Sequence, residues 1–148
     1  MTVRIVERVA VAAPPEAVWA AVVDWEGQAR WILLTGVTVE PGERGVGQRF
    51  TARTSLGPIG FEDPMEVIRW DPPHRADVAH QGTLVRGTGS FVVTPAPGGA
   101  WFTWVEDLDP PGGRLGTLGL RAIEPVVRAG LRASLRRIAR GIEAETRR

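Results

Sequence analysis

Acid–base chemistry in this chain of 148 residues can rest on only a few side chains. Cys and Tyr are absent, and all 18 basic residues are Arg because the sequence holds no Lys. Thiolate nucleophiles, disulfides, phenolic acids and Schiff-base lysines are thereby excluded. What remains for proton transfer is His74, His80, the carboxylates, the few hydroxyls and water.

Three polar residues fall on apolar faces of predicted strands, because side chains alternate between the two faces of a strand. Asp63 is in phase with Phe61, Met65 and Val67, His80 with Val78, and Glu106 with Phe102, Trp104 and Leu108. We expect all three on the inner wall of an apolar cavity, where a carboxylate beside the imidazole would favour its charged form. This arrangement suits general acid–base catalysis, such as enolising a ketone or losing water from a β-hydroxy group, with His80 as the base.

A purely structural interpretation stays open for each of these three residues. A histidine on a strand is often hydrogen-bonded within the fold, and a carboxylate near Arg86 can simply be paired with it. A β-bulge would also invert the assigned faces. Gly87 and Gly89, in phase with each other, would let a ligand or a neighbouring backbone come close. If the phases hold, the residues expected to contact a ligand are Trp104, Phe102, Phe91, Met65, Phe61, Arg86, Trp31 and Leu131.

No motif predicts a cofactor or a metal ion. His74 and His80 lie six residues apart, which is no recognised metal-ligand spacing. The glycines between Gly42 and Gly47 have neither the spacing nor the lysine of a phosphate-binding loop, so they indicate a hairpin turn. Ser90 with His80 lacks the Gly-x-Ser-x-Gly elbow of a hydrolase nucleophile. We therefore expect no cofactor and no metal.

The elements that must position these residues begin with a strand over Val3–Ala12. Pro14 or Pro15 suits the first position of a helix that is predicted to run to about Trp25, and a second short helix is expected from Glu26 to about Leu33. Six strands joined by short turns follow, and strands joined in this way must be antiparallel. They are expected at about residues 37–39, 48–54, 61–70, 74–81, 83–94 and 100–108.

The last part of the chain has a helical period. Apolar residues fall near one face at Ile123, Val127, Leu131, Leu135, Ile138 and Ile142. They predict an amphipathic helix from about Pro125 to the end, or a longer helix that begins near Leu115 and is kinked at Pro125. The fold class is then α+β, with a seven-stranded antiparallel sheet curled around the long C-terminal helix and two short helices after the first strand.

Length and hydropathy bound the organisation of the chain. We expect residues 1–148 to form one domain, because a chain of this length can bury a sizeable core. No apolar run approaches the roughly 20 residues of a membrane span. Arg4, Glu7 and Arg8 interrupt the first apolar run, so a secretory signal is not expected either. We therefore expect a cytoplasmic protein without a membrane span.

Charge is distributed unevenly along the chain. Residues 114–148 hold nine Arg against three Glu, whereas residues 1–113 hold nine Arg against fourteen acidic residues. Arg128, Arg132, Arg136 and Arg140 recur every four residues, which is typical of the solvent face of an amphipathic helix. Aromatic residues do not interleave with these arginines, so we expect no nucleic-acid partner. The expected oligomeric state is a monomer or a homodimer.

The order of the predicted elements resembles the START-like, helix-grip superfamily, and within it the bacterial polyketide cyclase/dehydrase branch. The resemblance extends over almost the whole chain. It is carried by Ala12–Trp19, Asp24-Trp25 with Trp31, Gly45-Val46-Gly47, Trp70–Arg75, and Gly98-Gly99 before the aromatic strand Trp101–Glu106.

The resemblance implies a polyketide- or lipid-like hydrophobic small molecule held in a cavity between the sheet and the C-terminal helix. Members of the superfamily include aromatase/cyclases, lipid carriers, hormone receptors and chaperone cofactors, and they share no catalytic set. Three functions therefore stay open. The chain is a cyclase, aromatase or dehydrase, a carrier or sensor that leaves its ligand unchanged, or an interaction protein like the chaperone cofactors.

Overall fold

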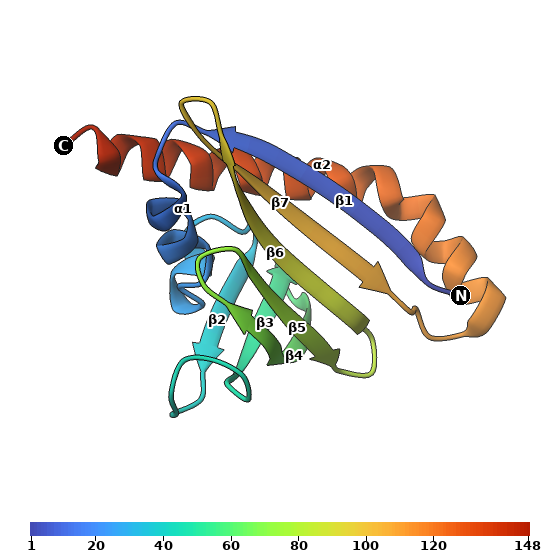
Figure 1. Cartoon of the computed structure of the whole chain (residues 1–148). Coiled ribbons are helices and arrows are strands. Elements are labelled where there is room, and N and C mark those ends of the chain that lie inside the picture. The colour runs from blue at the N-terminus through green and yellow to red at the C-terminus, as the bar shows by residue number, and fades with distance from the viewer.

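The computed structural model describes residues 1–148, in which one antiparallel sheet packs against two α-helices and a 3-10 helix (Figure 1). The sheet order is β1-β7-β6-β5-β4-β3-β2, so the last strand pairs with the first. The predicted α+β helix-grip fold is confirmed. In chain order the elements are β1 (Val3–Val11), α1 (Pro15–Val22), the 3-10 helix η1 (Glu26–Arg30), β2 (Thr35–Val39), β3 (Arg49–Leu56), β4 (Ile59–Asp71), β5 (Arg75–Gln81), β6 (Arg86–Ala96), β7 (Gly99–Leu108) and α2 (Gly113–Thr146).

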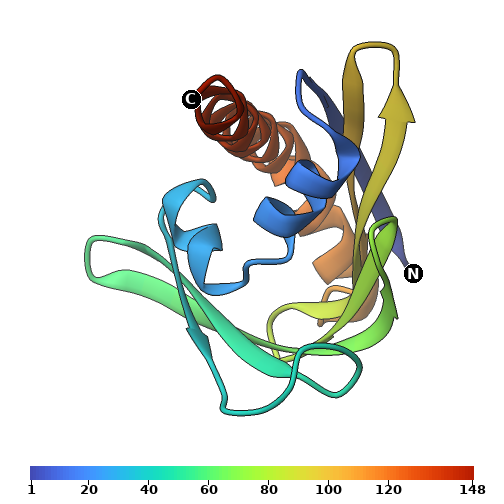
Figure 2. The ribbon, with the colours of Figure 1, turned by 60° about the vertical axis from the view of Figure 1, so that its left-hand side comes forward.

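The sheet is strongly curved, and its concave side holds the helices (Figure 2). Alternation along the strands separates a buried face from an exposed one, as in β5, where Ala76, Val78 and His80 are buried. The pairing of β4 with β5 shifts register between Val67 and Arg69. Because this irregularity comes after Asp63 and Met65, it leaves the inward phase of both residues intact.

Aromatic side chains fill one end of the curve. Pro15 begins α1 at a position that needs no amide donor, and the helix buries Val18, Trp19 and Val22. Trp25 follows and stacks on Phe50 of β3, with 4.6 Å between the ring centroids. This cluster belongs to the hydrophobic core and anchors α1 and the start of η1 to the sheet.

The long helix begins twelve residues before Pro125, so the predicted start near Pro125 is wrong and the longer alternative, kinked at Pro125, is the better description. Proline inside a helix removes one amide donor and crowds the preceding turn, and a helix of 34 residues tolerates that local loss. The axis of α2 changes direction between its first and second parts (Figure 1).

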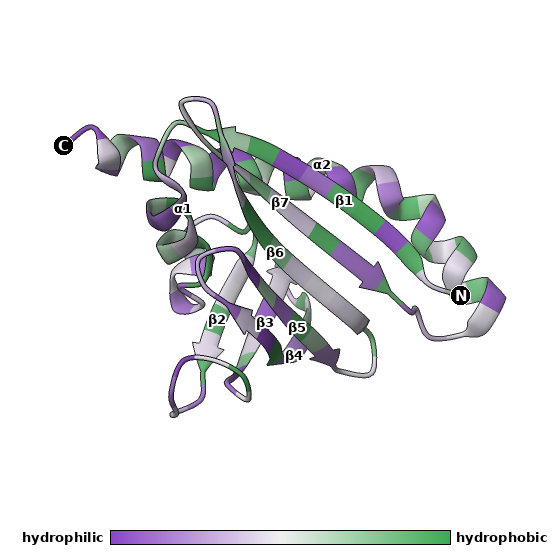
Figure 3. Cartoon of the chain, viewed as in Figure 1, coloured by the Kyte–Doolittle hydropathy of each residue, from purple (hydrophilic) through white to green (hydrophobic).

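The two parts of α2 differ in burial. Leu135, Ile138 and Ile142 in the second part are almost fully buried, whereas Ile123 is 54% exposed. Figure 3 shows hydrophobic and hydrophilic residues alternating along the helix, as the amphipathic pattern predicts. No helix in the structure is both long enough and apolar enough to span a lipid bilayer.

Polar contacts hold α2 in place over the sheet. Glu7 of β1 accepts hydrogen bonds from Arg128 at 3.1 Å and from Arg132 at 3.0 Å. Partial burial alone would raise the pKa of Glu7, but these two guanidinium groups lower it below its ordinary value. On the other side, the backbone amide of Leu33 donates to Ser134 Oγ at 3.1 Å. The helix is thus tied to both edges of the space that it covers.

Candidate functional site

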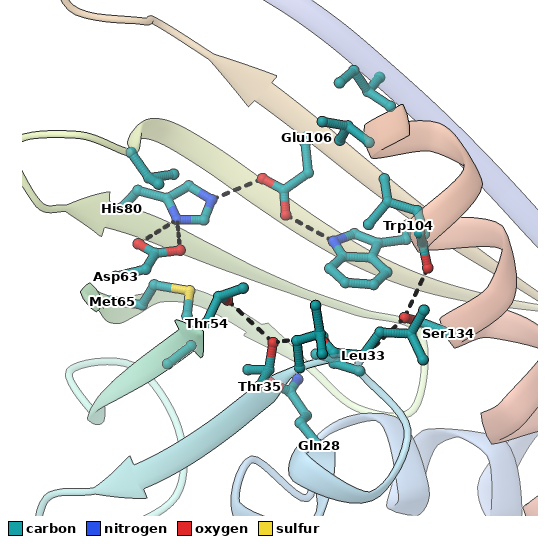
Figure 4. A pocket seen from close by; sticks show the side chains of 18 of the residues that line it. Gln28, Leu33, Thr35, Thr54, Asp63, Met65, His80, Trp104, Glu106 and Ser134 are labelled. Atoms are coloured by element: carbon teal, nitrogen blue, oxygen red, sulfur yellow. Dashed lines mark hydrogen bonds and ion pairs between the residues drawn. The ribbon is translucent and has the colours of Figure 1, made fainter. Parts of the chain in front are cut away.

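A cavity of about 360 Å³ lies between the concave face of the sheet and α2. Thirteen of its 21 lining residues are hydrophobic. The lining comes from β1, η1 and the segment that follows it, strands β2 to β7, and α2. Figure 4 shows the polar side chains of this lining. The lining consists of Ile5, Gln28, Ile32, Leu33, Leu34, Thr35, Ala52, Thr54, Phe61, Asp63, Met65, His80, Val85, Phe91, Trp104, Glu106, Leu108, Val127, Gly130, Leu131 and Ser134.

The charged groups of the lining form one connected cluster, which we call the triad: Asp63, His80 and Glu106. His80 Nδ1 lies 2.9 Å from both carboxylate oxygens of Asp63, and Nε2 lies 2.7 Å from Glu106 Oε2 (Figure 4). The second oxygen of Glu106 accepts a hydrogen bond of 2.8 Å from the indole Nε1 of Trp104. The imidazole is therefore held on both sides by carboxylates.

A glycine of β6, Gly89, makes this contact geometrically feasible. His80 is on β5 and Glu106 on β7, with β6 between them, so their strands are about 10 Å apart. The residue of β6 opposite His80 is Gly87, and the residue opposite Glu106 is Gly89. A Cβ at Gly89 would lie 3.1 Å from Glu106 Oε1. The glutamate side chain thus crosses β6 over a position that carries no side chain of its own.

The two glycines differ in what comes close to them. At Gly89 the neighbour is the side chain of Glu106. At Gly87, which has a φ of 118°, a Cβ would overlap the backbone carbonyl oxygen of Asp107. The sequence predicted that a ligand or a neighbouring backbone comes close to these glycines. At Gly87 the close neighbour is a backbone, that of Asp107.

The electrostatics of the triad decide its protonation state. Burial alone would lower the pKa of His80, but its hydrogen bonds to Asp63 and Glu106, together with their negative charges, raise it to about 10. At neutral pH the ring therefore carries two protons and donates from both nitrogens. An imidazolium between two carboxylates gives the cluster a net charge of −1.

The structure brings most of the predicted site residues together around one cavity. Asp63, His80 and Glu106 line it, as do the predicted ligand-contacting residues Phe61, Met65, Phe91, Trp104 and Leu131. These placements support the predicted positions, while the roles of the residues stay predictions.

Three predicted ligand-contacting residues do not line this cavity. Phe102 is in phase with Trp104 but fully buried, since Phe91 and Trp31 pack against its ring. Trp31 is buried edge-on against Phe102 and Trp104, and its indole N–H has no hydrogen-bond partner. Arg86 is exposed and donates to the backbone carbonyl of Asp109 at 3.3 Å, so it does not pair with a triad carboxylate.

Sequence reasoning did not single out the polar residues of the opposite wall. Gln28 comes from η1, Thr35 and Thr54 from paired positions of β2 and β3, and Ser134 from α2. The helical period offers a signal for Ser134, because it adjoins the apolar positions Leu131 and Leu135. No comparable periodic signal marks Gln28 in a 3-10 helix of five residues.

A second cavity of about 460 Å³ adjoins the first. The two cavities share Phe61, Val85, Leu108 and Val127 in their linings. The second one continues under the first part of α2, where Leu120 and Ile123 line it, and it includes Arg86. The apolar space open to a ligand therefore extends from the triad toward the N-terminal end of α2.

A metal ion has no ready site in the chain. No group of three or more His, Asp or Glu side chains has an arrangement that could hold one. Within the triad, the ring nitrogens and the carboxylate oxygens bond to one another instead of converging on a common point.

Fold and cavity together define a helix-grip protein with an apolar pocket, and comparisons with solved structures agree. The Zhui aromatase/cyclase from Streptomyces sp. R1128 is 16% identical, with 97% of this chain and 94% of that chain covered and a TM-score of 0.79. A protein from Thermus thermophilus is 17% identical, with 99% of each chain covered and a TM-score of 0.79. At such identities the likeness concerns the fold.

A further solved structure is the di-domain aromatase/cyclase StfQ from the steffimycin biosynthetic pathway. It is 16% identical with a TM-score of 0.78, and the match covers 98% of this chain but 51% of that one. The chain thus spans about half the length of that protein. A search of the curated proteins finds no match.

The sequence also matches a protein-family model, described as polyketide cyclase / dehydrase and lipid transport, over residues 2–143. The chain belongs to this family, which confirms the predicted resemblance. Family membership and the apolar cavity together support a role in binding a hydrophobic ligand.

Proposed function

We propose that this protein binds a polyketide- or lipid-like small molecule in the cavity between the sheet and α2. The observation that carries the proposal is the cavity itself, which has a predominantly apolar lining and a single charged cluster on its wall. Binding sites for small molecules typically combine such apolar walls with a few convergent polar groups. The triad then serves to orient the polar end of the ligand.

The state of His80 favours a carrier or sensor over an enzyme that uses this residue as a base. A general base needs a nitrogen without a proton at the operating pH, and it must reach the proton that it removes. With a pKa raised to about 10 and both ring nitrogens bonded to carboxylates, His80 offers neither. Holding a ligand without changing it requires no such nitrogen.

A cyclase or dehydrase is the second candidate, and the titratable triad on the cavity wall favours it. In the loss of water from a β-hydroxy ketone, a carboxylate oxygen of Glu106 would remove the proton next to the carbonyl. An N–H of His80 would protonate the departing hydroxyl, which leaves as water, and the proton on Glu106 would then restore the imidazolium. This balanced sequence uses Glu106 as the base and His80 as the acid, the reverse of the expectation from sequence.

The proposal is tested by blocking the cavity. Leu131 lines it from α2, whereas Leu118 on the same helix is 63% exposed and lines neither cavity. Leu131→Trp is expected to weaken binding of the neutral fluorophore N-phenyl-1-naphthylamine by at least about tenfold, because an indole fills the space that the probe needs. Leu118→Trp, the same substitution on the surface, should bind like the wild type. Equal binding by both variants, or no binding by the wild type, would refute a ligand cavity here.

Extraction of the purified protein and mass spectrometry of the extract would identify co-purifying ligands. With an authentic ligand, His80→Ala and Glu106→Ala separate the two candidates. If the protein is a cyclase or dehydrase, both variants should bind the ligand and fail to convert it. A carrier predicts that the wild type also returns the ligand unchanged.

A further inference from the structure

We propose that the cavity selects ligands whose polar end is a neutral or cationic hydrogen-bond donor, such as a hydroxyl or an ammonium group, and rejects ligands that end in a carboxylate. This inference rests on the proposed function, because it specifies the ligand class of the same cavity. It follows from which polar atoms of the wall are already engaged and which are left over.

The donors near the triad are all in use. His80 donates from both ring nitrogens, and Trp104 donates its only N–H to Glu106. These three N–H groups engage carboxylates that together offer about eight acceptor positions. Acceptor capacity therefore remains on Asp63 and Glu106 after every neighbouring donor has been spent.

The hydroxyls of the lining are engaged as well. Ser134 Oγ donates to the carbonyl of Gly130 at 2.9 Å, and Thr35 Oγ1 donates to the carbonyl of Leu33 at 2.9 Å. Since the Thr35 proton is used there, Thr54 is the donor in the 3.1 Å contact between the two threonines. The amide of Gln28 lies away from the triad, on the opposite part of the wall (Figure 4).

Burial shows which triad atoms a ligand can reach. The side chains of Asp63 and Glu106 are each 12% exposed, whereas that of His80 is 4% exposed. All three side chains line the cavity, and those of the two carboxylates are the more accessible. A ligand hydroxyl or ammonium group placed there would form a hydrogen bond to an ionised acceptor, the stronger kind of hydrogen bond.

A ligand carboxylate would meet the opposite situation. No Arg lines the 360 Å³ cavity, and Arg86, which lines the adjoining one, is exposed and donates from Nε to the backbone carbonyl of Asp109. The anion would lose its hydration in an apolar space and face a cluster of net charge −1, with no unused donor beside the triad and no cationic side chain in the lining to compensate it. Such an uncompensated charge is an effective means of excluding one ligand class.

Four probes with one apolar body test this selectivity: naphthalene, 2-naphthol, 2-naphthylmethylammonium and 2-naphthoate, titrated by calorimetry at pH 7.5. We expect 2-naphthol and the ammonium compound to bind at least about tenfold more tightly than 2-naphthoate, with naphthalene between them. Equal binding of all four, or tighter binding of 2-naphthoate, would overturn the selectivity and leave the proposed function standing. If none binds, naphthalene included, both proposals fail.

Variants assign the effect to the triad. Glu106→Gln removes the charge on the cavity side of β7, and Asp63→Asn is an independent variant on β4. Each variant is expected to reduce the ratio between the dissociation constants of 2-naphthoate and 2-naphthol by about tenfold, because the wall loses a negative charge. The matched control is Asp107→Asn, since Asp107 is the next residue of β7 but pairs with Arg4 on the other face. If Asp107→Asn reduces this ratio as much as Glu106→Gln does, the assignment of the selectivity to the triad is contradicted.

Discussion

The proton on His80 makes this fold less stable as the pH rises into the alkaline range. Folding raises the pKa of this residue from an ordinary value of 6.5 to about 10. A group whose pKa is raised on folding stabilises the folded state fully below its unfolded value, and that contribution is lost as the pH rises through the folded value. We therefore expect the free energy of unfolding to decrease between about pH 6.5 and about pH 10.

The magnitude follows from the size of the shift. Each pKa unit corresponds to about 1.4 kcal/mol, so the complete loss over this range amounts to about 5 kcal/mol. About half of this loss is expected between pH 7.5 and pH 9.5, because the slope flattens as the folded pKa is approached. For a domain of ordinary stability, this is a large fraction of the total.

The composition of the chain makes this experiment unusually clean. Lys, Tyr and Cys, the side chains that ordinarily change charge between about pH 8 and pH 11, are all absent. Urea unfolding followed by tryptophan fluorescence at pH 7.5, 8.5 and 9.5 measures the loss directly. In a His74→Gln background, NMR of the single remaining imidazole measures the pKa of His80 independently.

The control is His80→Gln, in which the slope between pH 7.5 and pH 9.5 should disappear. Glu106→Gln should leave an intermediate slope, since Asp63 still bonds to the ring. An imidazole that titrates near pH 6.5 in the folded protein would refute the reasoning. A wild-type slope that persists in His80→Gln would refute it as well.

Two glycines offer opposite expectations. Gly89→Ala places a methyl group 3.1 Å from Glu106 Oε1, so it should lower the pKa of His80 and cost about 1–2 kcal/mol of stability, measured by the same NMR and urea experiments. An unchanged pKa would mean that Glu106 accommodates the methyl group without leaving His80. Gly141→Ala, inside α2 with nothing within 4 Å of the added methyl group, should instead stabilise the protein by about 1 kcal/mol. A lower urea midpoint for this variant would contradict the open space around Gly141.

The fold was predictable because local signals agree with one another. Alternating strands, glycine- and proline-rich turns and one long amphipathic segment leave few ways to bury the apolar faces. The start of α2 was harder to place, because Pro125 resembles a first helical residue. The predicted alternative start near Leu115 lies two residues after the observed start at Gly113, but the first part of α2 buries so little that its apolar pattern did not decide between the two starts.

The sequence was enough to predict which side chains of the candidate site point inward. It was not enough to predict how deeply they are buried or which charged groups contact one another. Strand parity places Asp63, His80 and Glu106 on one side, because the register shift in β4 occurs only after Val67. Parity does not tell that Phe102, two residues before Trp104, lies beneath other rings. It also does not give the distance between side chains on different strands, so the carboxylates on both sides of His80 are visible only in three dimensions.

Gly89 of β6 links what strand parity predicts to what only the three-dimensional structure shows, because its empty inward position lets Glu106 reach His80. A side chain in place of Gly89 would obstruct the path of Glu106 to His80, and the imidazole would then keep only the carboxylate of Asp63. Buried charged clusters are often no more stabilising than apolar residues of the same size. The inward position left empty at Gly89, over which a glutamate reaches a buried histidine, therefore fits the proposed ligand recognition better than it fits a role in stability. On this argument, Gly89 is as much a part of the candidate site as the three charged residues.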